Sequence, residues 1–282
     1  DESCKVGGAT YFQSFVFEEF YPDYQAIINC SDSDLAEEFP DSGKVRIIMK
    51  DDTHYFINRY PFRNNRDVRE QLSNFADIPI LKSDLEEVLP DEIDAFVLNP
   101  LNRFDFPLET IEFLKSFGVP IFMSVQGFLR ISDVQVNENY TIKLDKSYDL
   151  TDILSGVSAI FLDESELDII GQGFDVDEMV ITNGSHGSRI ISDGEIKIGV
   201  VKCDDVVDTT GCGDTYMAAY ISQKLHSKSI ENAGNFASAI ASEKIKYKYV
   251  TQYIDVNFVS DDKKLEWKTA LVNLLNNRKM PV

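Results

Sequence analysis

The sequence predicts an α/β fold in which a doubly wound, mainly parallel sheet is flanked by helices. From about residue 94, short apolar runs alternate with stretches of helical periodicity, which is typical of parallel strands joined by crossover helices. The runs are apolar throughout, as expected for strands that are buried on both faces. With 282 residues and 43% hydrophobic content, the chain can bury one large core, and we expect a single domain over residues 1–282.

The predicted strands in the middle of the chain are the apolar runs 95–98, 119–123, 159–162 and 179–182. Helical or turn segments separate them at 108–117, 149–154 and 165–170. In doubly wound folds, ligands bind beyond the carboxyl ends of the strands. Asn99 and Gln126 follow two of these strands and are therefore candidates for contacts with a substrate, with hydrogen bonding at a strand end as the structural alternative.

The C-terminal part continues the α/β pattern. Residues 189–192 and 195–201 are predicted strands, with a turn at Asp193 and Gly194 between them. Apolar residues recur at helical spacing over 216–225, and further helices are predicted at 229–241 and 265–275.

A pair of strands is predicted early in the chain, over approximately residues 44–60. The runs 45–50 and 53–57 flank a tight turn at Asp51 and Asp52, which is the pattern of an antiparallel hairpin. An ordinary surface hairpin is the simplest interpretation of this pattern taken alone.

The most informative segment is 208–215, which reads Asp-Thr-Thr-Gly-Cys-Gly-Asp-Thr. It lies between a predicted strand and a predicted helix. Gly211 and Gly213 let the backbone approach a ligand closely, and the first-turn amides and positive dipole end of the helix form an anion site. Asp214 adds a carboxylate at the same point, where a helix cap is the alternative role. This arrangement suits phosphoryl transfer.

Two common glycine codes do not fit this segment. A dinucleotide fingerprint needs a third Gly or Ala where the chain has Tyr216, which argues against a Rossmann oxidoreductase. A Walker A loop needs Gly-Lys-Ser or Gly-Lys-Thr, and neither occurs in the sequence.

The amino-acid composition limits the classes of binding partner that the protein can have. The 48 acidic and 27 basic residues give a formal net charge of −21, which repels nucleic acid. Binding of a polyphosphate then calls for local positive groups or a divalent metal, for which Mg²⁺ is the natural expectation. The four cysteines form no C-x-x-C pair, and no apolar run of membrane-spanning length occurs. We expect a cytoplasmic protein without membrane or nucleic-acid partners.

Residues 208–215 resemble the C-terminal signature of the ribokinase or PfkB family of carbohydrate and nucleoside kinases, with Cys212 in place of Ala. Three further segments resemble family features in the same order along the chain: the glycine pair at 7–8, the segment 125–130 and the segment 181–187. The resemblance implies a ribokinase-like fold in which the early hairpin is a small β lid that closes over the acceptor and excludes water. It also implies a substrate-binding Asp about twenty residues before the glycine pair, and no residue of this sequence is assigned that role.

The resemblance implies an ATP-dependent kinase that acts on an alcohol hydroxyl by direct in-line transfer. Asp214 is then the general base, and the amides of Gly211, Cys212 and Gly213 stabilise the developing charge. The Cys212 thiol could instead be a low-pKa nucleophile, but no His is placed near it in sequence.

Metal-ligating residues are also implied. Glu166 and Asp163 fall where the family carries Asn-x-x-Glu and would organise Mg²⁺ through water, with a solvated acidic loop as the alternative. Asp208 and the carbonyl of Thr210 resemble ligands of an activating monovalent cation such as K⁺. However, residues 245–249 lack the Gly-Ala usual in the second half of that cation loop, which argues against potassium dependence.

The remaining implied contacts concern substrate and nucleotide. Gly7, Gly8, Asn99, Gln126 and Arg130 would border the acceptor, although a surface ion pair is an alternative for Arg130. Implied nucleotide contacts are Thr182, Gly184, Thr209 and Ser238. Taken alone, Thr182 could cap a turn and Ser238 could be a helix-packing residue.

The expected substrate is a small sugar or polyol, because the segment 126–130 is similar to one sugar-kinase branch. A nucleoside is the alternative acceptor, and a non-catalytic sugar- or nucleotide-binding regulatory protein on the same fold is the competing class. The lid could also join two subunits into a homodimer.

Overall fold

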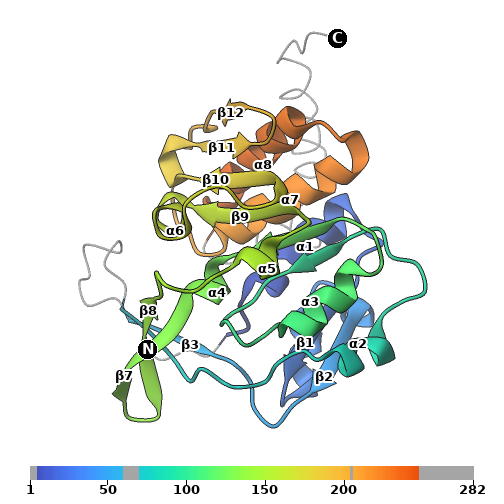
Figure 1. The fold of residues 1–282 in the computed structure, drawn as a ribbon, viewed down its shortest axis with the longest axis vertical. Coiled ribbons are helices and arrows are strands. Elements are labelled where there is room, and N and C mark those ends of the chain that lie inside the picture. The colour runs from blue at the N-terminus through green and yellow to red at the C-terminus, as the bar shows by residue number, and fades with distance from the viewer. Residues whose placement is uncertain (1–4, 60–69, 204–205, 248–282) are drawn as a thin grey trace.

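The computed structural model describes residues 5–59, 70–203 and 206–247, and the structural statements below concern these residues. A six-stranded sheet has the strand order β12-β11-β10-β9-β6-β5, and smaller sheets of four and two strands accompany it (Figure 1). The predicted helix at 265–275 lies outside the described residues.

The six-stranded sheet is parallel in its centre. Its strands are β5 (Phe96–Leu98), β6 (Ile121–Ser124), β9 (Val157–Asp163), β10 (Val176–Thr182), β11 (Ser188–Ile191) and β12 (Glu195–Ile198). Strands β5, β6, β9 and β10 pair in parallel, whereas β11 pairs antiparallel with β10 and β12 pairs antiparallel with β11. The predicted strands at 95–98, 119–123, 159–162, 179–182 and 189–192 are therefore confirmed, and the strand predicted at 195–201 ends earlier, at Ile198.

Helices cover both faces of this sheet. One face carries α1 (Ala9–Phe20), α7 (Cys212–Ser227) and α8 (Ile230–Lys244). The other helices are α2 (Lys82–Val88), α3 (Leu108–Lys115), α4 (Gln126–Leu129), α5 (Thr151–Leu154) and α6 (Glu164–Ile170). Phe161 of β9 packs in one core with Tyr220 of α7, whereas its neighbour Ile160 packs in the other core with Ile111 of α3. Successive residues of a strand point to opposite faces, and the doubly wound fold is thereby confirmed.

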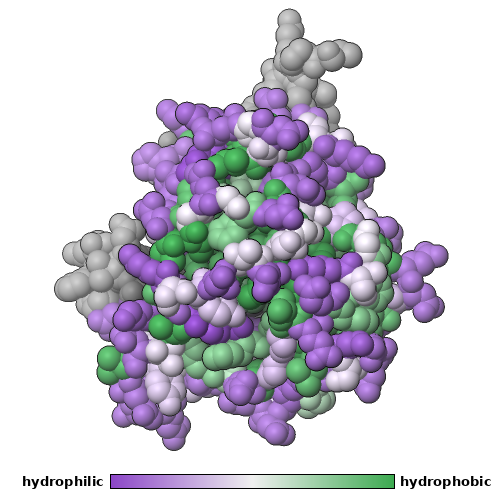
Figure 2. Space-filling model, in the orientation of Figure 1, coloured by the Kyte–Doolittle hydropathy of each residue, from purple (hydrophilic) through white to green (hydrophobic). Residues whose placement is uncertain are grey.

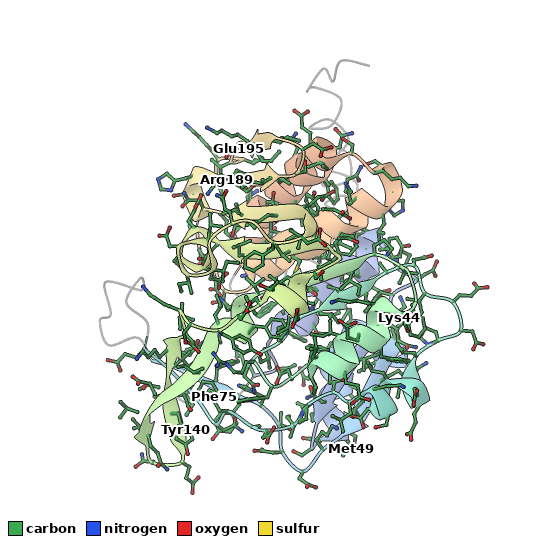
Figure 3. The ribbon with its side chains drawn as sticks, viewed as in Figure 1. Lys44, Met49, Phe75, Tyr140, Arg189 and Glu195 are labelled. Atoms are coloured by element: carbon green, nitrogen blue, oxygen red, sulfur yellow. The ribbon has the colours of Figure 1, made fainter. Side chains whose placement is uncertain are left out.

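The four-stranded sheet is antiparallel and joins distant parts of the chain. Its order is β3 (Phe56–Arg59), β4 (Glu70–Ser73), β8 (Asn139–Leu144) and β7 (Arg130–Val136). Phe75, which follows β4, makes an edge contact with Tyr140 of β8 at 6.4 Å between ring centroids, and the two side chains lie together at this sheet in Figure 3. A β-bulge between Ser132 and Gln135 interrupts the pairing of β7 with β8.

The antiparallel pairing predicted within 44–60 is wrong. Strand β2 (Val45–Met49) pairs in parallel with β1 (Ala26–Cys30), and β3 begins only at Phe56 and pairs with β4. Val45 and Ile48 are buried, so β2 is a core strand rather than a lid strand. The four-stranded sheet, which contains β3, is the candidate lid in its place, and residue 60 at the predicted boundary lies outside the described residues.

The two-stranded sheet lies beside α1. The short 3₁₀ turns η1 (Ser33–Glu38) and η2 (Ser42–Lys44) connect its strands, and the Lys44 ammonium forms a 2.7 Å ion pair with Glu18 of α1. Helix α1, strand β1 and the pair β7–β8 are additions to the predicted elements.

The surface in the view of Figure 2 is mainly hydrophilic. Hydrophilic residues cover most of the face drawn in Figure 2, and the hydrophobic residues on it form separate patches. None of the helices described is long and apolar enough to cross a membrane.

Replacement of Gly127 should destabilise the fold. A Cβ at this position would lie 2.0 Å from the Pro100 carbonyl oxygen, and this backbone atom cannot move aside as a flexible side chain could. We expect Gly127→Ala to lower the free energy of unfolding by at least ~2 kcal/mol. Denaturant unfolding measures the change.

The matched control is Gly194→Ala, because a Cβ there meets no atom within 4 Å and Gly194 has no positive φ. Its effect should stay within about 0.5 kcal/mol. Equal losses in the two variants would contradict a specific clash at Gly127.

Candidate functional site

Four predicted site residues lie at the carboxyl ends of neighbouring parallel strands. Asn99 follows β5, Gln126 begins α4 after β6, Asp163 ends β9 and Thr182 ends β10. Because these strands are parallel and adjacent, all four residues lie along one edge of the sheet.

The 208–215 segment forms a compact turn before α7. The Asp208 carboxylate accepts a 3.0 Å hydrogen bond from the Thr210 amide, and the Cys212 amide donates to the Thr209 carbonyl at 3.1 Å. Gly211 is the N-cap of α7 and adopts a left-handed conformation with φ 74°. No side chain caps this helix, so its positive end is available to an anion. One of the three predicted anion-binding amides, that of Cys212, is engaged within the turn.

A close contact brings the N-terminal glycine pair to this turn. A Cβ on Gly211 would lie 2.6 Å from the Phe12 ring, so only glycine allows the turn to approach α1 so closely. The Phe12 amide in turn bonds the Gly8 carbonyl at 3.2 Å, and Gly8 is the N-cap of α1 with φ 88°. The N-termini of α1 and α7, which are distant in sequence, are thus held together.

Asp214 lies among charged groups at the start of α7. Burial raises the pKa of its carboxyl to about 6, and the charges of Arg130 and Lys244 oppose this rise. A carboxyl of this kind is still ionised at neutral pH. It can therefore accept a proton from a bound hydroxyl.

Arg130 connects this carboxylate to the lid. It is the first residue of β7, and its guanidinium lies over the Phe56 ring of β3, 4.9 Å from the centroid. The guanidinium also donates to the Gln126 amide oxygen. The two predicted substrate-binding residues Gln126 and Arg130 are therefore hydrogen-bonded to each other, next to the lid.

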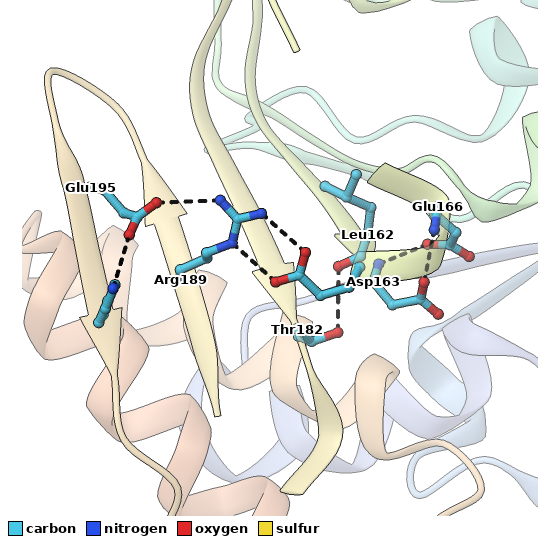
Figure 4. Close-up of polar contacts among 8 residues, drawn as sticks. Leu162, Asp163, Glu166, Thr182, Arg189 and Glu195 are labelled. Atoms are coloured by element: carbon cyan, nitrogen blue, oxygen red, sulfur yellow. Dashed lines mark hydrogen bonds and ion pairs between the residues drawn. The ribbon is translucent and has the colours of Figure 1, made fainter. Parts of the chain in front are cut away.

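Asp163 and Glu166 bind one another at the start of α6 (Figure 4). The Asp163 amide donates to the Glu166 carboxylate and the Glu166 amide donates to the Asp163 carboxylate, each at 2.9 Å. Ser165 donates a further bond of 2.6 Å to Asp163. Glu166 is only 4% exposed, and burial, with the nearby Asp163 charge, raises the pKa of Glu166 to about 7.

The structure also contains an ion-pair cluster near Thr182 that was not predicted from the sequence. The Arg189 guanidinium bonds both oxygens of Glu164 at 3.0 Å and also pairs with Glu195 at 3.3 Å, as Figure 4 shows. Thr182 donates a weak 3.4 Å hydrogen bond to the Leu162 carbonyl. This cluster fixes strand β11 and the edge strand β12 against the start of α6.

Several predicted binding residues already have partners within the protein. The side-chain amides of Asn99 and Gln13 form two mutual hydrogen bonds, of 2.9 and 2.7 Å, which is the structural role considered for Asn99. The Ser238 hydroxyl donates to the Gly199 carbonyl at 2.8 Å, as expected of a packing residue. Gly184 begins the 3₁₀ turn η3 (Gly184–His186), and Thr209 is exposed.

The Cys212 side chain is not set up as a nucleophile. Burial raises the pKa of its thiol to about 11, and the Lys244 charge offsets this only in part. Its sulfur lies 3.5 Å from the Ala241 carbonyl oxygen, as a hydrogen-bond donor.

Two site residues have no signal in the sequence. His54 contacts the Ser73 hydroxyl at 2.7 Å and the Asn102 amide at 3.2 Å, and burial, with the charge of Arg130, lowers the pKa of His54 to about 4. Lys244 lies behind the 208–215 turn. A single histidine in a polar loop and a lysine at a helix end are both ordinary surface patterns.

Among the described residues, no group of three or more His, Cys, Asp and Glu side chains is arranged to hold a metal ion. The carboxylates of Asp163 and Glu166, the predicted magnesium ligands, each already accept a backbone hydrogen bond.

Sequence comparison supports the resemblance in the second half of the chain. Residues 143–256 match the pfkB family of carbohydrate kinases. This match covers less than half of the chain and agrees with the resemblance to the ribokinase/PfkB family. A nucleoside kinase from Methanocaldococcus jannaschii is 38% identical over 68 residues, which cover 24% of this chain and 22% of that protein. The alignments with the curated relatives span between 22% and 36% of their lengths.

Solved structures of the ribokinase family share the fold over nearly the whole chain. A pyrophosphate-dependent kinase, solved with a pyrophosphate analogue and myo-inositol, superposes with a TM-score of 0.70 at 22% identity, covering 92% of this chain and 94% of that chain. Ribokinase from Arabidopsis thaliana, solved with ribose and ATP, has a TM-score of 0.64 at 19% identity and covers 100% of this chain and 91% of that chain.

Replacing Glu166 should make the protein more stable at alkaline pH. The unfolded carboxyl ionises near pH 4.5, whereas the folded carboxyl retains its proton up to about pH 7. Stability is therefore lost as the pH rises through this window and is unaffected below it. We expect Glu166→Gln to be ~2–3 kcal/mol more stable than the wild type at pH 8, with the difference vanishing below pH 5.

Denaturant unfolding at the two pH values measures this change. The control is Glu87→Gln, which alters an exposed carboxyl. Its difference in stability from the wild type should be the same at the two pH values. A Glu166→Gln variant that is less stable than the wild type at pH 8 would contradict the buried, strained carboxylate.

Proposed function

We propose that this protein is an ATP-dependent kinase that phosphorylates a hydroxyl of a sugar or polyol by direct in-line transfer. The observation that carries the proposal is the position of Asp214. Its carboxylate lies in the first turn of an uncapped helix, and the contact of Gly211 with Phe12 holds it beside the N-terminus of α1.

Asp214 acts as the general base. Its carboxylate accepts the proton of the acceptor hydroxyl as that oxygen attacks the terminal phosphorus of the donor, and the bond to the leaving phosphate breaks. Negative charge grows on the phosphoryl oxygens during this step. The amides at the start of α7, with its positive dipole end, stabilise that charge.

The acceptor lies between the glycine pair and Asp214, under the lid. Gln126 and Arg130 are hydrogen-bonded to each other at this place, and Phe56 of the lid covers the Arg130 guanidinium. Closure of the lid excludes water, which would otherwise compete as the acceptor. A polar rim of amides and one guanidinium suits the hydroxyl groups of a polyol or sugar.

Thr182, Gly184 and Thr209 are the proposed contacts of the phosphate donor. The two neighbouring structures differ in their donors, because one is a ribokinase complex with ATP and the other is a pyrophosphate-dependent kinase. Pyrophosphate is therefore the second candidate donor. Both donors present the same polyphosphate chemistry to the N-terminus of α7.

Asp163 and Glu166 would hold Mg²⁺ through water. They fit this role in part, because each is a carboxylate at the strand-end edge of the sheet, but each already accepts a backbone amide and Glu166 also has a side-chain hydrogen bond with Gln126. When bound, Mg²⁺ supplies positive charge that neutralises the phosphates. The two carboxylates would orient its water ligands, and the capping bonds keep them fixed.

A nucleoside is the alternative acceptor, and a nucleoside kinase is among the sequence relatives. A non-catalytic binding protein remains the competing class, because Asp163 replaces the Asn of the family pattern and adds repulsion against a polyphosphate. Phosphoryl transfer to any member of a panel of polyols, sugars and nucleosides decides against that class. Homodimer formation through the lid is part of the same proposal.

Asp214→Asn should abolish most of the turnover. The amide keeps the shape of the side chain but cannot accept the proton, so we expect kcat to fall by about 10²–10⁴-fold. A coupled assay with Mg²⁺ and either ATP or pyrophosphate measures it, and calorimetric binding of the donor should change little.

Asp193→Asn, at an exposed turn between β11 and β12, is the matched control and should keep wild-type turnover. Asp214→Asn with wild-type turnover on the preferred acceptor would remove the proposed base.

The pH dependence of kcat/KM should have an acidic limb. Asp214 must be ionised to accept a proton, and its pKa is raised to about 6. The value of kcat/KM should therefore fall as the pH drops through about 6 and level off above about 7. A profile that stays flat down to pH 5 would contradict a base with this raised pKa.

A further inference from the structure

Lys244 is a buried cation directly behind the phosphoryl-transfer turn. It is the last residue of α8 and is 1% exposed. Its ammonium donates a 3.1 Å hydrogen bond to the carbonyl oxygen of Asp208. The next residue, Ile245, accepts bonds at its carbonyl from the amides of Val207 at 2.8 Å and Asp208 at 3.2 Å. The end of α8 thus fixes the beginning of the turn through three hydrogen bonds.

The groups that face this ammonium are acidic. Burial lowers the pKa of Lys244, and the charges of Asp208, Cys212 and Asp214 oppose that change. From the other side, the Lys244 charge lowers the pKa of both Cys212 and Asp214. A buried ammonium is costly unless it is paired. Its position at the C-terminus of a helix, together with the carboxylates, offsets that cost.

Asp208, one of the two expected ligands of a monovalent cation, already has partners within the protein. The Asp208 carboxylate binds the Thr210 amide at 3.0 Å, and the Asp208 carbonyl binds the Lys244 ammonium. A K⁺ ion at this carbonyl would lie against the Lys244 ammonium. Asp208 therefore does not fit a monovalent cation while Lys244 is in place. Residues 248–249 of the segment that lacks Gly-Ala lie outside the described part.

We propose that the Lys244 ammonium is the built-in cation of the 208–215 turn, and that it makes the protein independent of monovalent metal ions. Lys244 is a positioning residue: it fixes the Asp208 carbonyl and supplies positive charge behind Asp214. It acts through the turn rather than on the substrate. The inference rests on the proposed kinase function, and its test includes a measurement that does not require turnover.

The first test compares salts with the wild-type protein. Turnover and the thermal unfolding midpoint are measured in KCl, NaCl and tetramethylammonium chloride at equal ionic strength. We expect both quantities to differ by no more than experimental error among the three salts. Activation by K⁺ over tetramethylammonium, or a K⁺-specific rise in the midpoint, would overturn the proposal.

The second test uses Lys244→Ala, which removes the ammonium and leaves space at the Asp208 carbonyl. In tetramethylammonium chloride we expect a lower unfolding midpoint and at least ~10-fold lower kcat, because the turn loses a fixed charge. In KCl, the unfolding midpoint and kcat of this variant should be partly restored, since K⁺ can then enter the space beside the Asp208 carbonyl. The acidic limb of kcat/KM should move to higher pH, because the charge that holds down the pKa of Asp214 is gone.

Lys246→Ala is the matched control, since this exposed lysine lies two residues further on and pairs with Glu243. It should show neither the loss nor the salt response. If Lys244→Ala matched the wild type in midpoint, turnover and pH profile, the proposal would be wrong. If no acceptor were phosphorylated by the wild type, the kinase proposal would fail, whereas the salt-specific midpoint of Lys244→Ala would still test the cation role.

Discussion

The contact of Gly211 with the Phe12 ring is the constraint on which the site depends. It exists only because position 211 has no side chain and adopts φ 74°. Through it, two helices from opposite ends of the described chain present their N-termini together. The parallel strands add their carboxyl ends from the side, and a site forms where none of these elements alone would make one.

The sheet could be predicted from the sequence because its central strands are buried on both faces. Runs such as 159–162 and 179–181 are apolar throughout, and this pattern can be recognised without knowing the partner strand. The strand-end rule then located Asn99 and Gln126 along one edge, where the structure also places Thr182. These predictions needed only local information, and the structure confirms the arrangement of the elements.

The lid and the charges behind the turn could not be predicted in the same way. The pairing of β4 with β8 joins Leu72 to Thr141, and the polar alternation of such strands is weak without its partner. Lys244 is similar, because α8 ends in ordinary helical residues and only the tertiary fold buries its side chain. Long-range pairing and burial, rather than local propensity, determine both features.

The position of Arg130 would link any movement of the candidate lid to the basicity of Asp214. The residue begins a lid strand and lies over a lid ring, and its charge lowers the pKa of Asp214. By thermodynamic reciprocity, an arrangement that brings Arg130 closer favours the ionised carboxylate, and ionisation favours that arrangement by the same free energy. If the lid opened and carried this guanidinium away, the pKa of Asp214 would rise and its ionised form would become less favourable. Proton uptake and lid opening would then be two readouts of one equilibrium.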